Sequence, residues 1–245
     1  MAGFKYASIN QAPIYESVVN GKGKKIINRI LMGTYVTILE KDGEWYRVAT
    51  AGPNGWIHAG NLSDEMGLKI FFLDVGQGDG VLLEAGNYKV LIDSGPNNNM
   101  YGYLTKWQYT YILGAKQKVH IDYLIISHFD VDHYKGVTKI LNDSRFTFGT
   151  IIHPGILKMA TKENPYNSGI GSTIKQDGKT YLSLVFDNLL KISQPVTFNR
   201  DITAFLKALL KANDEGRVLK VKRYEQGSKI IQKKIEKKTF RIEVL

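Results

Sequence analysis

Residues 119–136 read VHIDYLIISHFDVDHYKG, and this stretch decides the fold of most of the chain. An apolar run from Ile121 to Ile126 has the length and composition of a buried strand. Residues 131–141 then have the apolar spacing of a helix. Between them lie four side chains that can bind a metal, namely His128, Asp130, Asp132 and His133. The stretch therefore predicts a strand-to-helix turn that presents several ligands from one loop held at both ends.

The spacing of these four side chains suits a divalent metal. His128 and Asp130 are two positions apart, so they point to one side of an extended chain. Asp132 and His133 are adjacent and diverge, so they can serve a second ion or the far side of the first. Imidazole nitrogen with carboxylate oxygen suits zinc, manganese or iron, and two such ions can generate a hydroxide and clamp a phosphoryl group. The alternative is a polar turn in which an Asp caps the helix.

SHFDVDHYKG resembles the HxHxDH metal motif of the metallo-β-lactamase fold, with Asp130 at the second motif position. Upstream, LKIFFLDVGQGDGVLLEAGNYKVLIDSG (Leu68–Gly95) is similar to the start of the metallo-β-lactamase domain of ComEC-type competence proteins. Those domains open with an LDVGQGDA-like turn, continue to an LIDxG strand end and often carry SHxDxDHxGG. The resemblance implies an α/β sandwich and metal-dependent hydrolysis, with phosphodiesters of nucleic acid or nucleotides as the expected substrates.

The resemblance also implies roles for the residues of the motif. His128, Asp130, Asp132 and His133 would bind one or two ions of zinc or manganese. Asp132 would in addition act in catalysis by orienting the attacking water, so no side-chain nucleophile is needed.

Further candidates come from neighbouring turns. The GQGDG turn faces the metal site in the resembled family, which makes Asp74, Gln77 and Asp79 candidates. The loop that carries His128, Asp130, Asp132 and His133 is called the metal loop below. Asp93, at the end of its strand, would orient the metal loop rather than bind metal. A simple turn or strand-ending Asp is the alternative for each of them. His153 ends a strand in FGTIIHPG but follows the motif too soon to match the next metal His of the family, so it is a weaker candidate.

The N-terminal part reads as a separate small all-β domain. Residues 4–63 hold short β patterns (APIYESVV, TYVTILE, WYRVATA, GWIHAGNL) separated by turns, which favours a small barrel. INQAPIYES, GTYVTILEKDGEWYRVAT and GPNGWIHAGNL resemble a bacterial SH3 (SH3b) domain. The resemblance implies a peptide or protein ligand, and places Trp45, Tyr46 and Trp56 in the core or in a binding groove. The predicted domains are 1–65 and 68–245.

Two later segments allow more than one interpretation. Residues 96–118 begin as a polar loop and become rich in Tyr, Trp and Lys. Such rings can stack on a single-stranded nucleic acid, or pack as an amphipathic helix on the sheet, and we favour packing for most of them. Residues 181–191 and 202–213 have helical spacing, and strands are expected over 217–230 and 237–245.

The composition of the chain limits the kinds of partner and the cellular location that we expect. The formal net charge of +10 favours an anionic partner, nucleic acid first. Positive charge is concentrated in residues 217–241, which contain ten Lys or Arg and only two Glu. These side chains either contact phosphates or form a solvated surface. No apolar run reaches the length of a membrane span and no signal peptide is evident, so the expected location is the cytoplasm, without membrane contact. The chain has no Cys, which excludes disulfides and Cys-rich zinc sites.

The second half of the family pattern is missing. The family fold needs a later Asp in a TGD-like turn and a late His, and this chain has neither. We therefore expect an incomplete sandwich. Either the chain is truncated, or it is a real short protein. The rival hypothesis is a non-catalytic interaction protein with an SH3b targeting module and a degenerate hydrolase domain. A hydrolase of small esters or lactams is a weaker third. The sequence leaves the metal, the substrate, the SH3b ligand and the oligomeric state open.

Overall fold

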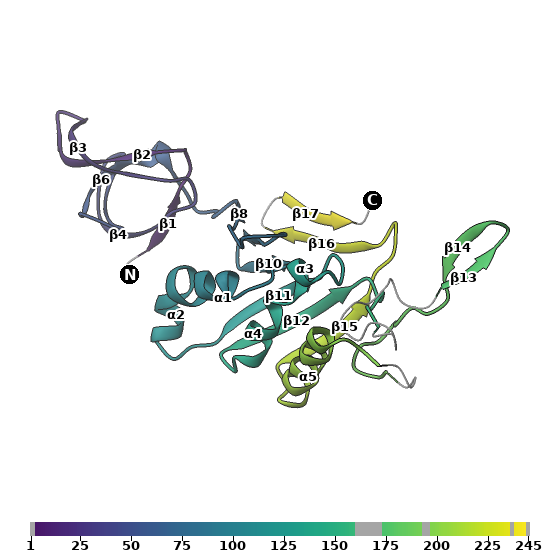
Figure 1. The fold of residues 1–245 in the computed structure, drawn as a ribbon. Coiled ribbons are helices and arrows are strands. Elements are labelled where there is room, and N and C mark those ends of the chain that lie inside the picture. Colours follow the sequence, from purple (N-terminus) through teal and green to yellow (C-terminus); the bar gives the residue numbers. More distant parts are fainter. Residues whose placement is uncertain (1–2, 160–172, 193–196, 236–237, 244–245) are drawn as a thin grey trace. The chain divides into compact units, whose positions relative to one another are not determined.

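The computed structural model describes residues 3–159, 173–192, 197–235 and 238–243, and divides the chain into two compact units (Figure 1). The first unit is Met1–Lys69 with the short pieces Ala85–Asn87 and Lys234–Lys238, and the second holds the rest. The main division lies after Lys69, and the predicted domain bounds, 1–65 and 68–245, stay a prediction. No helix in the described ranges is both long enough and apolar enough to cross a membrane.

The first unit is a single sheet that encloses a small apolar core. Its strand order is β3-β2-β6-β5-β4-β1-β7. The strands are β1 (Phe4–Ala7), β2 (Ala12–Val19), β3 (Lys22–Ile30), β4 (Tyr35–Asp42), β5 (Trp45–Ala49), β6 (Gly55–His58) and β7 (Leu62–Ser63). Its buried side chains are Ala7, Ala12, Ile14, Ile30, Val36, Val48 and Ile57. The strand-rich N-terminal part agrees with the predicted small all-β domain.

The three aromatic residues singled out in this unit are all half-buried. Tyr46 packs against the core, as expected for a core aromatic. The indole of Trp45 donates to the carbonyl of Gly21 at 3.3 Å and meets the ring of Tyr15 edge-on. Trp56 stands on β6, opposite Tyr15. Tyr46 therefore serves the core, and Trp45 lies at its rim.

The second unit is built on a six-stranded sheet with the order β15-β12-β11-β10-β9-β8. The strands are β8 (Leu68–Phe72), β9 (Val81–Ala85), β10 (Tyr88–Ile92), β11 (Val119–Ile125), β12 (Phe146–His153) and β15 (Val218–Arg223). β10, β11, β12 and β15 are parallel. The predicted apolar strand is confirmed as most of β11, at the centre of this parallel set, where both of its faces are covered. Parallel strands bring the polar residues that follow them to one edge of the sheet.

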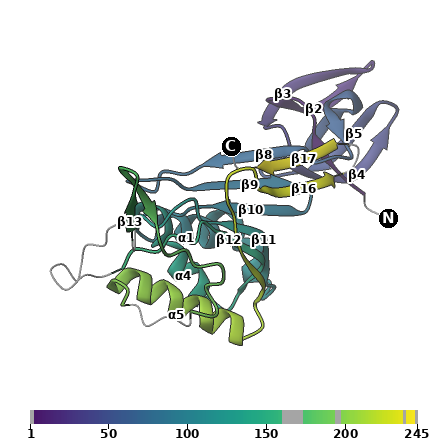
Figure 2. The ribbon, with the colours of Figure 1, turned by 90° about the vertical axis from the view of Figure 1, so that its right-hand side faces the viewer.

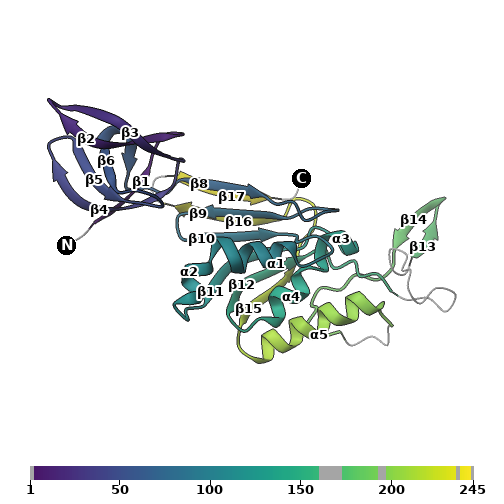
Figure 3. The same ribbon diagram turned by 60° about the vertical axis from the view of Figure 1, so that its left-hand side comes forward.

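Helices cover one face of this sheet and a hairpin covers part of the other (Figure 3). On the helical face lie α1 (Asn99–Tyr103), the π-helical turn η2 (Leu104–Gln108), α2 (Thr110–Gly114), α4 (Val137–Asn142) and α5 (Arg200–Asp214). On the opposite face lie β16 (Lys229–Ile235) and β17 (Lys238–Glu243), and Ile231 of β16 joins a core with Val90, Ile125 and Ile152. The mixed α/β architecture is as predicted.

The helix expected over 131–141 is broken in two, α3 (Val131–Tyr134) and α4. The break lies at Gly136, whose amide donates to the carbonyl of Gly95. A Cβ there would lie 2.5 Å from the carbonyl oxygen of Asn97 and 2.7 Å from that of Ser94. Backbone packs directly on backbone at this point, so a side chain is excluded.

The two predictions for later helices had different outcomes. The helix expected over 202–213 is confirmed by α5, whose first turn is capped by the side chain of Asn199 on the amide of Ile202. The helix expected over 181–191 is wrong, because the segment leaves β14 (Lys179–Leu182) as irregular chain. Phe186 and Leu189 are buried in the core all the same. Their apolar spacing therefore reflects burial of an irregular segment.

The aromatic segment 96–118 is only partly packed. Tyr109 is buried, and Tyr101 and Tyr103 pack against the core, which confirms packing for these rings. Trp107 and Tyr111 are 75% and 89% exposed, so they are the exceptions to a prediction that holds for the other three rings. An exposed pair of rings next to Lys106 keeps the stacking interpretation open on this surface.

The packing of α5 on the metal loop gives a test of the fold. Phe205 is fully buried, and its ring lies 5.7 Å from the rings of both Phe129 and Tyr134. We expect Phe205→Ala to lower the free energy of unfolding by about 3–5 kcal/mol, measured by urea unfolding with circular dichroism. Leu219→Ala is the control, because Leu219 is 78% exposed and its loss should change stability by less than about 0.5 kcal/mol. Equal effects of the two substitutions would contradict the described core.

Candidate metal centre

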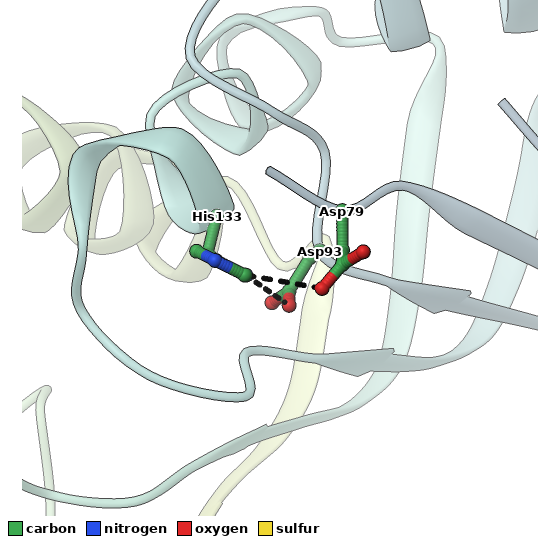
Figure 4. A group of neighbouring side chains, drawn as sticks. All are labelled: Asp79, Asp93 and His133. Carbon is green, nitrogen blue, oxygen red and sulfur yellow. Dashed lines mark hydrogen bonds and ion pairs between the residues drawn. The ribbon is translucent and has the colours of Figure 1, made fainter. Parts of the chain in front are cut away.

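Three side chains from separate elements of the second unit meet at the strand ends (Figure 4). Asp79 comes from the turn between β8 and β9, Asp93 follows β10, and His133 lies on α3. Each offers one potential ligand atom, and these atoms lie within 4.8 Å of one another. Among the described residues, this is the group of three or more His, Cys, Asp or Glu side chains that could hold a metal ion.

Asp93 anchors this group from inside the protein. Its side chain is almost fully buried, and its backbone adopts a left-handed conformation with φ of 53°. One carboxylate oxygen accepts the amide of Ser127 at 2.9 Å, and the other accepts the Ser127 hydroxyl. Burial raises the pKa of Asp93, and these hydrogen bonds oppose that rise by favouring the ionised form. The end of β10 is thus tied to the end of β11.

His133 is held by the same carboxylate. Its Nδ1 lies 2.9 Å from Oδ2 of Asp93 and 3.8 Å from Oδ2 of Asp79. A carboxylate accepts but does not donate, so the short contact assigns the proton to Nδ1. That tautomer leaves the Nε2 lone pair free, which is the usual arrangement of a metal-binding His with a carboxylate behind it. Asp93 therefore contacts a residue of the metal loop, and its expected role in orienting that loop stays a prediction.

His128 and Asp130 form the outer part of the loop. The His128 ring lies 3.8 Å from the His133 ring, centroid to centroid, and its Nδ1 is 3.0 Å from the Ser127 hydroxyl. Nε2 of His128 lies 3.7 Å from Asp130, in line with the predicted one-sided spacing. The ammonium of Lys158 binds the other oxygen of Asp130 at 2.5 Å and holds the pKa of that carboxyl below its usual range.

The capping alternative is not what the structure uses at this turn. Asp130 occupies the N-cap position of α3, but its side chain makes no capping hydrogen bond. The carboxylate points to Lys158 and His128 instead. The turn is therefore shaped by these contacts and by its backbone.

Asp132 meets the GQGDG turn through its backbone. Gly78 has φ of +79°, and a Cβ there would lie 1.9 Å from the carbonyl oxygen of Asp132. Only glycine fits this approach. The Asp132 carboxylate is half-buried and makes no hydrogen bond or ion pair with the described residues. Its predicted role in binding metal and orienting water stays a prediction.

The other candidates in the turn lie outside the group of three. Asp74 accepts the amide of Gly76 at 3.0 Å and so stabilises its own turn. Gln77 is exposed, and its side chain makes no hydrogen bond to the described residues. Asp79 alone from this turn reaches His133.

His153 lies at the end of β12, apart from the group of three. It is fully buried, and neither ring nitrogen has a hydrogen-bond partner among the described residues. Burial, with the nearby charge of Arg223, lowers its pKa to about 4. Its carbonyl accepts the amide of Tyr224. The ring is therefore neutral near pH 7.

Three further residues shape the site and were not among the candidates. Ser127 joins Asp93 to the metal loop, Lys158 pairs with Asp130, and the Tyr224 hydroxyl donates to the carbonyl of Ser127. The position of Ser127, directly before the motif, is a usable sequence signal. Lys158 and Tyr224 are distant in sequence and carry none.

The donor set fits a divalent metal. Imidazole nitrogen and carboxylate oxygen are ligands that zinc and manganese accept, and in this group His133 and Asp79 offer them while Asp93 holds the imidazole. The Nδ1 contact to Asp93 fixes the imidazole. The second imidazole, of His128, lies against the first.

The buried His153 predicts a pH dependence of stability. The unfolded chain takes up a proton at this residue below about pH 6.5, whereas the folded chain does so only near pH 4. Stability should therefore fall as the pH drops from 6.5 to 4, by at most about 3 kcal/mol from this group. Urea unfolding of wild type and His153→Leu between pH 7 and 4.5 tests this, and the variant should lose less stability. Parallel pH curves would refute it.

The comparisons with known proteins agree with this architecture. Residues 20–63 match the family model described as Bacterial SH3 domain. Residues 73–189, which include the metal loop and all three members of the group, match the Metallo-beta-lactamase superfamily model. No curated protein matches the chain. The chain thus has a segment similar to bacterial SH3 domains, followed by a segment similar to the metallo-beta-lactamase superfamily.

Proposed function

We propose that the protein is a metal-dependent hydrolase that cleaves phosphodiesters of nucleic acid or nucleotides. The observation that carries the proposal is the meeting of Asp79, Asp93 and His133 at the strand ends. The metallo-beta-lactamase superfamily match supports a metal-dependent hydrolase. Phosphodiester chemistry and the ComEC-type branch are supported by the LDVGQGDG and SHFDVDH segments.

The proposed metal ligands lie on the metal loop and on the GQGDG turn. We assign His128, Asp130, Asp132 and His133 as ligands of one or two zinc or manganese ions, with Asp79 as a further ligand. A bound ion would supply a Lewis acid for water and for the phosphoryl oxygens. Asp93 holds His133 through Nδ1, so that Nε2 faces away from the carboxylate.

Two side chains have proposed roles other than metal binding, Asp132 in the loop and Lys158 beside it. The Asp132 carboxylate, unpaired among the described residues, is the group that orients the attacking water. Lys158 lies 2.5 Å from Asp130 and is 30% exposed, so its ammonium can also meet an anionic substrate. A cation there would offset charge that develops on the phosphoryl group.

Nucleic acid is favoured by a pocket near the GQGDG turn. The pocket holds about 510 Å³ and is lined by Asp74, Asn99, Lys106, Trp107 and their neighbours. Trp107 is 75% exposed, and an exposed indole beside a lysine suits a stacked base. The net charge of +10 points the same way.

The SH3 unit is proposed to bind a peptide or protein. An exposed aromatic cluster on this unit supports that role, since Phe4 and Tyr35 stack at 5.4 Å and are each about half exposed. Exposed aromatic pairs of this kind are common in binding surfaces. A purely non-catalytic interaction protein is the alternative function.

Metal binding is the first test. Protein loaded with zinc or manganese and then freed of excess metal should retain about one or two equivalents by elemental analysis, as expected for a site of this class. We expect His128→Ala/Asp132→Ala to lose most of this metal, because two ligands are removed. His58→Ala/Asp64→Ala, in the SH3 unit, is the matched control and should retain it. Wild type without bound metal would rule out the enzyme in this chain.

Hydrolysis is the second test. Metal-loaded protein should hydrolyse bis(p-nitrophenyl) phosphate and a single-stranded oligonucleotide. Asp132→Asn should lower kcat by about 100-fold or more, since a positioned acid or base contributes at least that much. Asp64→Asn serves as the control. A protein that binds metal and cleaves neither substrate would favour the non-catalytic alternative.

A further inference from the structure

A small basic pocket lies on the hairpin-covered face of the sheet in the second unit. It holds about 150 Å³ and is lined by residues of β11, β12, β15 and β16, of which β11, β12 and β16 are labelled in Figure 2. Tyr123, Thr150 and Lys220 lie in register across three strands, and Ile152 and Lys222 form the next row. Tyr224, Ser228 and Lys229 complete the rim on the other side.

Most of the positive charge at this pocket is uncompensated. Lys220, Lys222 and Lys229 make no ion pair with any residue in the described ranges. Arg223 differs, because it is bound to Asp187 at 2.6 Å and to Glu225 at 3.1 Å. Three free ammonium groups around one small hollow make a strong local positive potential.

The same pocket is joined to the metal centre by one side chain. Tyr224 lines the pocket, and its hydroxyl donates to the carbonyl of Ser127. Ser127 in turn donates to Asp93 and precedes His128. A ligand in the pocket would therefore lie next to the loop that carries the candidate metal ligands.

The size and chemistry of the pocket select the ligand. Pockets for drug-sized molecules hold about 300–1,000 Å³, so this one suits a single small group rather than a nucleoside. Lysine ammonium groups with Thr and Ser hydroxyls suit the oxygens of a phosphate. A neutral or cationic group would gain nothing from the three free lysines.

We infer that this pocket binds a phosphate of the nucleic-acid strand other than the one that is cleaved. The inference rests on the proposed function and deepens it, because it gives the substrate a second point of attachment beside the metal loop. It also assigns a function to lysines of the basic segment 217–241, which the sequence alone could explain equally well as a solvated surface.

Binding without metal separates this inference from the proposed function. The probe is a fluorescein-labelled single-stranded oligonucleotide of about 12 nucleotides, within the usual site size, followed by fluorescence anisotropy in EDTA. We expect Lys222→Ala/Lys229→Ala to weaken binding about tenfold. The slope of log K against log salt should become shallower by about 0.7, the value for one lost phosphate contact on a single strand.

The matched control removes the same charge elsewhere in the second unit. Lys175 and Lys179 are exposed on the β13 (Thr173–Gln176) and β14 hairpin, which projects away from the sheet of this unit in Figure 1. Lys175→Ala/Lys179→Ala should change affinity by less than about twofold. Lys222→Arg/Lys229→Arg should retain most of the affinity, since the charge is kept.

Several outcomes would overturn the inference. One is equal weakening by the two alanine pairs, which would show a general charge effect. Another is unchanged affinity in the pocket pair, or no oligonucleotide binding by the wild type. A third is that inorganic phosphate binds as tightly as the oligonucleotide, and that Lys222→Ala/Lys229→Ala weakens only the binding of phosphate. The pocket would then be a site for free phosphate. Cleavage of bis(p-nitrophenyl) phosphate should be unaffected by the pocket pair, and its absence in wild type would count against the proposed function instead.

Discussion

A buried carboxylate, that of Asp93, is the group on which the metal centre depends. Removing a carboxylate from water is costly unless its oxygens are hydrogen-bonded. Ser127 supplies an amide and a hydroxyl, and His133 supplies a ring nitrogen at 2.9 Å. All of these donors lie on the loop after β11 or on α3, so satisfying one buried charge also fixes the position of the metal loop. The orientation of the candidate ligand His133 therefore follows from a requirement of folding.

Close backbone contact does the rest of the positioning. The GQGDG turn meets the carbonyl of Asp132 at Gly78, and the loop after β10 meets the start of α4 at Gly136. Both contacts leave no room for a Cβ, so the three loops of the site approach one another as bare backbone. Backbone has fewer soft degrees of freedom than a long side chain. A site built in this way is held to a narrow range of geometries before any ligand binds.

Local patterns in the sequence were enough for the parts of the site that are close in the chain. The apolar run before His128 predicted β11, and period-two spacing predicted that His128 and Asp130 lie together. Contacts across the fold were not predictable in this way. The approach of Lys158 to Asp130 and of Tyr224 to Ser127 depends on how β12 and β15 order in the sheet. The helix wrongly expected over 181–191 has the same cause, since burial of Phe186 and Leu189 is imposed by neighbours.

The strand β15 is the last in the order of the six-stranded sheet, so among the described residues no strand of that sheet lies on its outer side. Unpaired strand edges invite pairing with another chain, and lysines along the edge are a common defence against it. Lys220 and Lys222 stand on this strand beside Leu219, which is largely exposed. The charges that we assign to substrate thus also oppose aggregation at the same edge. A substitution that changes the affinity of these lysines for an anion would then also change the tendency of the protein to aggregate.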